Sequence, residues 1–189
     1  MPNWCNNYLE LEHEDPAMIE RARKAFNDGR LLAEFVPVPE DLQITASPGT
    51  TDEALRAQYD RNVEKHGYAT WYEYAVNEWG TKWDVGGDGY EASDDGPNAT
   101  TMVFDSAWAP PCAAMDKLMD LGFKATLYYY ESGMCFAGIY SEDGDDFYEL
   151  GNMTAEEVAE ALPDELDIKF CISESMAEWE EDNQEVDDN

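Results

Sequence analysis

The sequence predicts an α+β sandwich, in which an antiparallel sheet carries helices on one face. Three observations support this fold class. Short segments of alternating apolar and polar residues are interspersed with segments of helical periodicity. Hydrophobic residues make up 43% of the 189 residues and aromatic residues 13%, which is enough to build a core. A chain of this length suits one domain with an appendage or long insertions.

The first two elements are a strand and a helix. The segment from about Trp4 to His13 alternates apolar and polar side chains and is expected to be a strand. Asp15-Pro16 then begins a helix as N-cap and first-turn proline, and Asn27-Asp28-Gly29 ends it. The segment Phe35–Pro39 is expected to be a non-helical loop across the core, because each proline holds its predecessor extended.

A helical insertion at about residues 40–80 precedes the second strand. Residues 51–66 and 68–79 both have helical periodicity. The second segment carries an apolar stripe that ends before Gly80 and consists of Trp71, Tyr72, Ala75, Val76 and Trp79.

Three further strands and one helix complete the predicted sheet. Residues 100–108 alternate as a strand, and Pro110-Pro111 begin a helix that ends at Gly122. Residues 123–131 and 134–140 are expected to pair as a hairpin joined by Ser132-Gly133. The order strand, helix, strand, helix, strand, strand fits an α+β sandwich with helices on one sheet face, which we expect to be ferredoxin-like.

The C-terminal part of the chain is strongly acidic. From Ser141 onward nineteen acidic residues face one base, Lys169, so this part contributes −18 to the net charge of −32. We predict a ferredoxin-like domain over 1–150. An additional helix and a strand at Leu166–Ile172 are expected over 151–173, packed on that domain. The remaining 174–189 are expected to be an acidic tail, a short helix or disordered.

Several sequence features exclude common classes of protein. The four cysteines are scattered, so neither a zinc site nor a disulfide framework is indicated. The first residues contain no secretory signal, and no stretch approaches the roughly 18 apolar residues of a membrane span. We therefore expect a cytoplasmic protein without a cofactor.

A distinctive set of motifs runs through residues 1–140. It combines W-G-T-K-W-D with a downstream A-W-x-P-P, and it comprises residues 1–7, Phe35–Pro39, Trp71-Tyr72, Trp79–Asp84, Phe104–Pro111, Tyr130–Gly133 and Phe136–Gly138. This set resembles the YubB-type family of phage and conjugative-plasmid proteins, which carries a ferredoxin-like domain. The resemblance implies an accessory protein of a mobile element. It implies no agreed biochemical activity that could be transferred residue by residue.

Catalytic and metal-binding motifs are poorly represented. Only His13 and His66 are present, and neither adjoins a recognisable nucleophile motif, so we do not expect an enzyme. Asp84, Asp88 and Asp95 occupy positions 1, 5 and 12 of a calcium-loop template. The third position is glycine and the twelfth lacks the bidentate glutamate, which makes these residues a weak metal candidate and an ordinary polar turn the simpler interpretation.

An aromatic cluster with one lysine is the first candidate site. It consists of Trp79, Lys82, Trp83 and Trp108. The tryptophans could fill the core while Lys82 pairs with an acid such as Asp84 or Asp105. Alternatively, they could form a pocket for a ligand that carries a carboxylate or phosphate.

The acidic surface is the second candidate site. Its expected partner-binding residues are Glu142, Asp143, Asp145, Asp146, Glu156, Glu160, Glu174, Glu178, Glu181 and Glu185. The last four are spaced to share one helical face. Such a surface repels nucleic acid and anionic membranes and attracts basic proteins. Enhanced solubility and adaptation to a saline cytoplasm are alternative reasons for the same charge.

Three functions follow as hypotheses. The first is a mobile-element accessory protein that inhibits a host nucleic-acid-processing or defence protein by mimicking nucleic acid. The second is a domain that binds a small ligand or metal through the aromatic cluster. The third is a scaffold that associates with itself through a sheet edge. The oligomeric state is not determined by the sequence.

Overall fold

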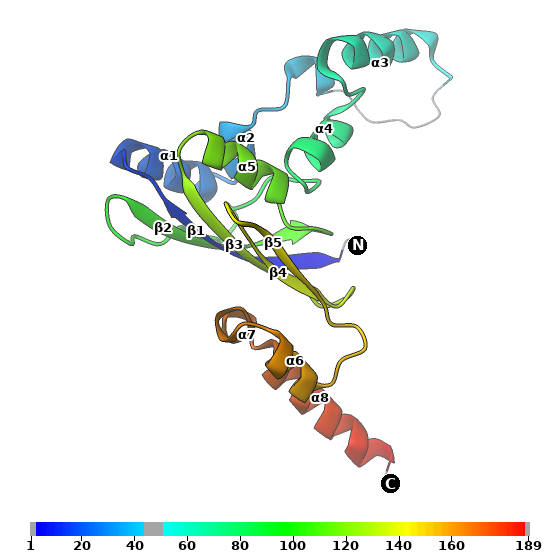
Figure 1. The fold of residues 1–189 in the computed structure, drawn as a ribbon. Helices are drawn as coiled ribbons and strands as arrows, with labels where there is room; N and C mark the ends of the chain where they lie inside the picture. Colours follow the sequence, from blue (N-terminus) through cyan, green and yellow to red (C-terminus); the bar gives the residue numbers. More distant parts are fainter. Residues whose placement is uncertain (1–2, 44–50, 188–189) are drawn as a thin grey trace.

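The fold is built on one antiparallel sheet. The computed structural model describes residues 3–43 and 51–187, with the strand order β2-β1-β3-β4-β5 (Figure 1). The strands are β1 (Trp4–Glu12), β2 (Ala99–Ala107), β3 (Lys124–Glu131), β4 (Phe136–Ser141) and β5 (Gly144–Glu149). Both β2 and β3 run antiparallel to β1, which lies between them. Helix α5 connects β2 to β3, so these elements form a split βαβ unit, as in ferredoxin-like sheets.

One layer of helices covers the face of the sheet that carries Leu9, Met102 and Leu127. It contains α1 (Pro16–Asn27), α2 (Leu31–Phe35) and α5 (Cys112–Asp120). Asp15 caps α1 as predicted, because its side chain accepts a hydrogen bond from the amide of Ala17. Since α2 includes Phe35, the non-helical covering segment begins at Val36, one residue later than predicted.

The helical insertion is present between α2 and β2. It consists of a 3-10 turn, η1 (Glu40–Leu42), and of α3 (Glu53–His66) and α4 (Trp71–Glu78). Figure 1 shows α3 extending away from the sheet, whereas α4 lies near α5. The insertion therefore adds little to the sheet itself.

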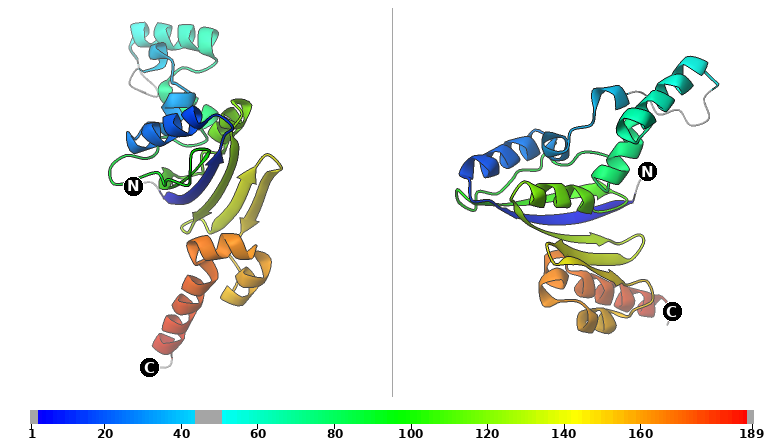
Figure 2. Two further views of the ribbon diagram at one scale, coloured as in Figure 1. Left: turned by 90° about the vertical axis from the view of Figure 1, so that its left-hand side faces the viewer. Right: turned by 45° about the horizontal axis from the view of Figure 1, so that its top comes forward.

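A second helical layer covers the opposite face of the sheet. It contains α6 (Ala155–Ala161), α7 (Asp164–Phe170) and α8 (Ile172–Asp187). The views in Figure 2 place this layer across the sheet from α1 and α5. A separate core of Tyr128, Ala137, Leu150, Val158 and Leu166 holds it there. The α+β sandwich is confirmed, but the expectation of helices on one face holds only for the elements up to α5.

One prediction for the C-terminal part is wrong, and one strand there was not predicted. Residues 166–172 were predicted as a strand, but Asp164–Phe170 is helical and Cys171 turns the chain with φ 51°. Strand β5 was not predicted, and it pairs with β4 at the edge of the sheet. The segment from 174 onward is part of the 16-residue helix α8, up to Asp187.

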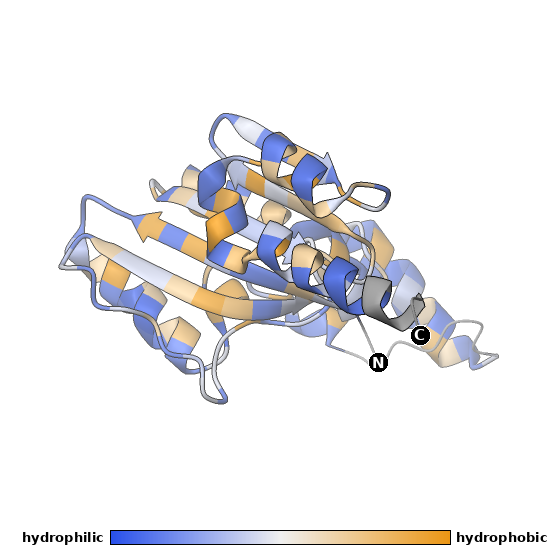
Figure 3. Ribbon diagram, turned by 90° about the horizontal axis from the view of Figure 1, so that it is seen from below, coloured by the Kyte–Doolittle hydropathy of each residue, from blue (hydrophilic) through white to orange (hydrophobic). Residues whose placement is uncertain are grey.

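The alternation of side-chain character explains how both faces are covered. Figure 3 shows hydrophilic and hydrophobic residues alternating along the strands. In β3, for example, Leu127 packs against the first helical layer and Tyr128 against the second. Among the described residues, no helix combines the length and apolar character that crossing a bilayer requires.

Candidate functional site

Part of the acidic surface lies on the β4–β5 hairpin. Glu142 and Asp143 form its turn, while Asp145 and Asp146 lie on the edge strand β5, and all four are exposed. The carboxylate of Asp145 is fixed in place, because it accepts a 2.6 Å hydrogen bond from the hydroxyl of Tyr129. These acids therefore lie on the turn and the edge strand of a regular hairpin.

The second part lies on α6 and α8. Glu156 and Glu160 are exposed on α6, and Glu174, Glu178 and Glu181 are exposed on α8. Glu185 is within α8, but its side chain lies outside the described residues. Two further acids anchor α8, and both contacts involve backbone amides: Glu180 accepts from Ala155 at 2.9 Å, and Asp167 accepts from Ser173 at 2.8 Å.

The charge of this surface is not neutralised within the molecule. None of the acidic-surface residues whose side chains are described forms an ion pair with a described base. Lys169, the one base of the C-terminal part, is only 15% exposed and points toward the sheet. Its ammonium lies 3.0 Å from Glu10 and 3.8 Å from the ring centre of Tyr8. It therefore does not offset the carboxylates on α6, α8 and β5.

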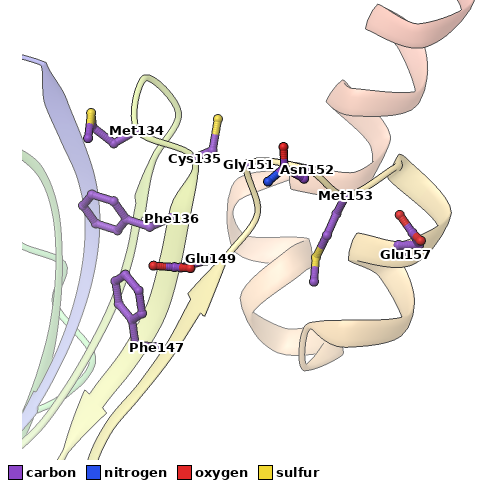
Figure 4. Close-up of a pocket in the computed structure, with 9 residues that line it drawn as sticks. All are labelled: Met134, Cys135, Phe136, Phe147, Glu149, Gly151, Asn152, Met153 and Glu157. Carbon is purple, nitrogen blue, oxygen red and sulfur yellow. The ribbon is translucent and has the colours of Figure 1, made fainter.

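An apolar groove opens where the β4–β5 hairpin meets the segment that leads to α6. It has a volume of about 640 Å³ and is lined by Met134, Cys135, Phe136, Phe147, Glu149, Gly151, Asn152, Met153 and Glu157. Figure 4 shows Phe136 and Phe147 side by side on the hairpin and Met153 on the segment leading to α6. The centres of the two phenylalanine rings are 5.6 Å apart, and the side chain of Phe147 remains 51% exposed.

The groove was missed by the sequence analysis. Phe147 lies on the unpredicted strand β5, and α6 reaches the groove only through the fold. The signal in the sequence was the pair Phe147-Tyr148 directly after two aspartates, because an aromatic pair in so acidic a stretch points to partial burial.

The aromatic cluster is assembled differently from the prediction. Lys82, Trp83 and Trp108 do lie together, since the Lys82 ammonium is 4.6 Å and 5.2 Å from the two ring centres. Trp79 instead belongs to the core, with 5% exposure and its indole N–H donating to the carbonyl of Val36. The exposed Trp4 takes its place, with its ring centre 6.0 Å from that of Trp83.

Lys82 and Trp108 are both unusual in this cluster. Lys82 forms no ion pair with a described acid, so the predicted pairing with Asp84 or Asp105 is not seen. Trp108 has a left-handed backbone with φ 66°, which is costly for a residue with a large side chain. Its exposed ring stacks on Trp83 at an interplanar angle of 25°.

The weak metal candidate is not assembled. Both carboxylate oxygens of Asp84 accept hydrogen bonds from the backbone of α2, and Asp95 accepts one from the hydroxyl of Ser93. Burial raises the pKa of Asp84, while those backbone amides act to lower it. Within residues 3–43 and 51–187, no group of three or more His, Cys, Asp or Glu side chains could hold a metal ion.

Comparisons with known proteins give one distant likeness. No family model and no curated protein match the chain. Among solved structures, it is similar to the crystal structure of the protein api92 from Yersinia pseudotuberculosis, described under the family model DUF1281. The identity is 13%, the match covers 81% of this chain and 99% of the other, and the TM-score is 0.45. This likeness assigns no family, and the resemblance to the YubB-type family stays a prediction.

Proposed function

We propose that this protein is a mobile-element accessory factor that binds a basic, nucleic-acid-processing host protein and blocks its nucleic-acid site. One observation carries the proposal: an apolar groove that includes Glu149 and Glu157 opens where the β4–β5 hairpin meets the segment before α6, and the described acidic-surface carboxylates have no basic partner among the described residues. Protein interfaces commonly have an apolar centre with a polar rim. The charge of this rim selects a basic partner.

The spacing of charge along α8 resembles that of nucleic acid. The helix contains seven acidic residues in sixteen positions and spans about 24 Å at about 1.5 Å per residue. That is one carboxylate per roughly 3.4 Å, the axial spacing of phosphates in one strand of duplex DNA. A groove that binds a phosphate backbone can therefore meet a similar linear charge density on α8.

The groove supplies what a phosphate backbone lacks. Phe147, Phe136 and Met153 offer an apolar surface next to the carboxylates of Glu149 and Glu157. Aromatic residues at the centre of an interface often dominate its binding energy. Such an anchor lets the protein compete with nucleic acid without matching its full charge.

The proposal is tested by capture from a host lysate at low salt, followed by a salt gradient. We expect one nucleic-acid-binding protein to be retained, released at moderate salt, and displaced by DNA or RNA. The triple variant Glu174→Gln, Glu178→Gln, Glu181→Gln should weaken capture at least about tenfold. The matched control Glu20→Gln, Asp60→Asn, Glu64→Gln removes the same charge from exposed positions on α1 and α3 and should bind as the parent does.

The groove is tested separately. Phe147→Ala should weaken capture, whereas Val103→Ala, at a similarly exposed position on β2, should not. Capture of many unrelated basic proteins, or equal losses in the α8 triple variant and its control, would contradict the proposal. Either result would mean that the net charge alone determines the binding.

A further inference from the structure

A second pocket lies at the opposite edge of the sheet from the hairpin groove, beside the edge strand β2. It has a volume of about 260 Å³, and three aromatic side chains line it: Trp4, Trp83 and Tyr90. Three carboxylates also line it: Asp84, Asp88 and Asp105. Strand β3 separates β1 and β2 from the hairpin in the sheet order, so the two pockets are distinct.

The wall of this pocket is held rigidly. The carboxylate of Asp84 accepts hydrogen bonds from the amides of Leu32 at 2.7 Å and Ala33 at 2.9 Å, which fixes the segment to α2. Gly86 is pressed against α1, because a Cβ there would lie 2.1 Å from the carbonyl oxygen of Phe26. A binding site that is already ordered loses little entropy when it is occupied.

Asp105 gives the pocket an uncompensated negative charge. Its carboxylate accepts hydrogen bonds from the side-chain amide of Asn6 at 2.6 Å and from the Tyr90 hydroxyl at 2.8 Å. Both donors are neutral, and Asp105 forms no ion pair with a described base. A carboxylate has about four lone-pair sites, so Asp105 can accept further donors.

Lys82 does not belong to this pocket. Its ammonium lies over the rings of Trp83, Trp108 and Tyr72, and it is absent from the pocket lining. Its ammonium nevertheless lies 4.6 Å from the centre of the Trp83 ring. An anionic ligand in the pocket would be repelled by three carboxylates and attracted by one neighbouring ammonium, so the pocket favours a cation.

We propose that this pocket binds a flat organic cation, the guanidinium group of arginine. Aromatic faces attract cations, and a guanidinium can stack on them while it donates hydrogen bonds to a carboxylate. An ammonium group is a more strongly hydrated point charge and fits such walls less well. The guanidinium can come from a small molecule or from an arginine side chain of a partner protein. The inference does not depend on the function proposed for the acidic surface.

The test is a titration of the full chain with N-acetylarginine amide and N-acetyllysine amide, followed by tryptophan fluorescence and calorimetry. We expect saturable binding of the arginine compound, about tenfold tighter than that of the lysine compound. Asp105→Asn should weaken binding at least about tenfold. Tyr90→Phe should preserve binding, because it frees an oxygen of Asp105. Lys82→Ala should strengthen it by removing a nearby positive charge, whereas an anion site would lose its ligand.

Two controls make the outcome decisive. Glu174→Gln removes one charge from α8 and should leave the titration unchanged, so the two proposals can fail separately. If Asp105→Asn lowers the thermal stability, Trp4→Ala replaces it, since Trp4 is 47% exposed. Equal affinity for both compounds, no saturation, or weaker arginine binding in Lys82→Ala overturns the proposal. Tighter binding of an arginine-containing peptide than of the free amide indicates a partner's side chain, and the reverse indicates a small molecule.

Discussion

The hydroxyl of Tyr129 on β3 donates a 2.6 Å hydrogen bond to Asp145 on β5, across the intervening strand β4. Gly138 makes this possible, because it lies opposite Tyr129 in the register and a Cβ there would be 2.2 Å from the hydroxyl oxygen. The side chain of a buried tyrosine thus crosses over β4 and positions one carboxylate of the acidic surface.

Gly138→Ala should destabilise the fold by roughly 3 kcal/mol, because the added methyl group must displace the Tyr129 ring from a packed position. The free energy of unfolding in urea measures this. Gly151→Ala is the control, since the nearest atom to its Cβ would be 3.7 Å away. Equal small losses in both variants would contradict the role assigned to Gly138.

Tyr129→Phe should cost about 1.5 to 3 kcal/mol, the usual range for a hydrogen bond to a charged group. The ring stays in place, so the change removes only the donor to Asp145. Urea unfolding measures the loss, and Tyr148→Phe, which removes a hydroxyl with no hydrogen bond to a described residue, should be nearly neutral. Unchanged stability in Tyr129→Phe would show that water replaces the bond at no cost.

Stability should fall when the pH rises above about 10, the ordinary pKa of tyrosine. Burial raises the pKa of Tyr128 and Tyr129, and the hydrogen bond to Asp116 raises that of Tyr140. The unfolded chain therefore releases these protons first, which favours unfolding as the pH passes the unfolded-state value. Urea unfolding between pH 8 and 11 measures the slope, which should be smaller in Tyr129→Phe. A slope unchanged in that variant would contradict the assignment to Tyr129.

Trp179→Ala should weaken partner capture and leave the stability nearly unchanged. Trp179 is 68% exposed on α8 among the glutamates of the acidic surface, so its truncation removes little packing. Exposed tryptophans are frequent hot spots in protein interfaces. Capture from lysate and thermal unfolding are compared with those of Trp108→Ala, which changes an exposed tryptophan outside the acidic surface. Equal losses of capture would contradict a specific role for α8.

Lys169→Met should loosen the second helical layer by about 1 to 2 kcal/mol. The change removes an ion pair with Glu10 and contacts with the rings of Tyr8 and Tyr128, which together hold α7 against the sheet. Amide hydrogen exchange in α7 and α8 should accelerate more than in α1. Lys24→Met, at an exposed position on α1, is the control, and equal exchange in both variants would contradict the prediction.

Much of the first helical layer and its strands could be predicted locally. The Asp15 cap, the helical insertion and the strands up to β4 follow from caps, prolines and periodicity, which act between neighbours in the sequence. The acidic positions could also be named, because charge is a property of composition. The position of those charges relative to an apolar groove could not be predicted, because the groove is formed by β4, β5 and the segment before α6 together.

The sequence by itself determined the α+β class, the excess of acid and most of the elements before Ser141. Tertiary structure decided the rest. The alternation from Leu166 to Ile172 suits a strand, yet the segment is helical because Leu166 and Ile172 enter the core under the sheet. Gly144–Glu149 has weak strand propensity and becomes β5 through its pairing with β4. Trp79 lies in the core and Trp4 lies beside Trp83 for the same reason: burial depends on which elements meet, and residues distant in the sequence determine that.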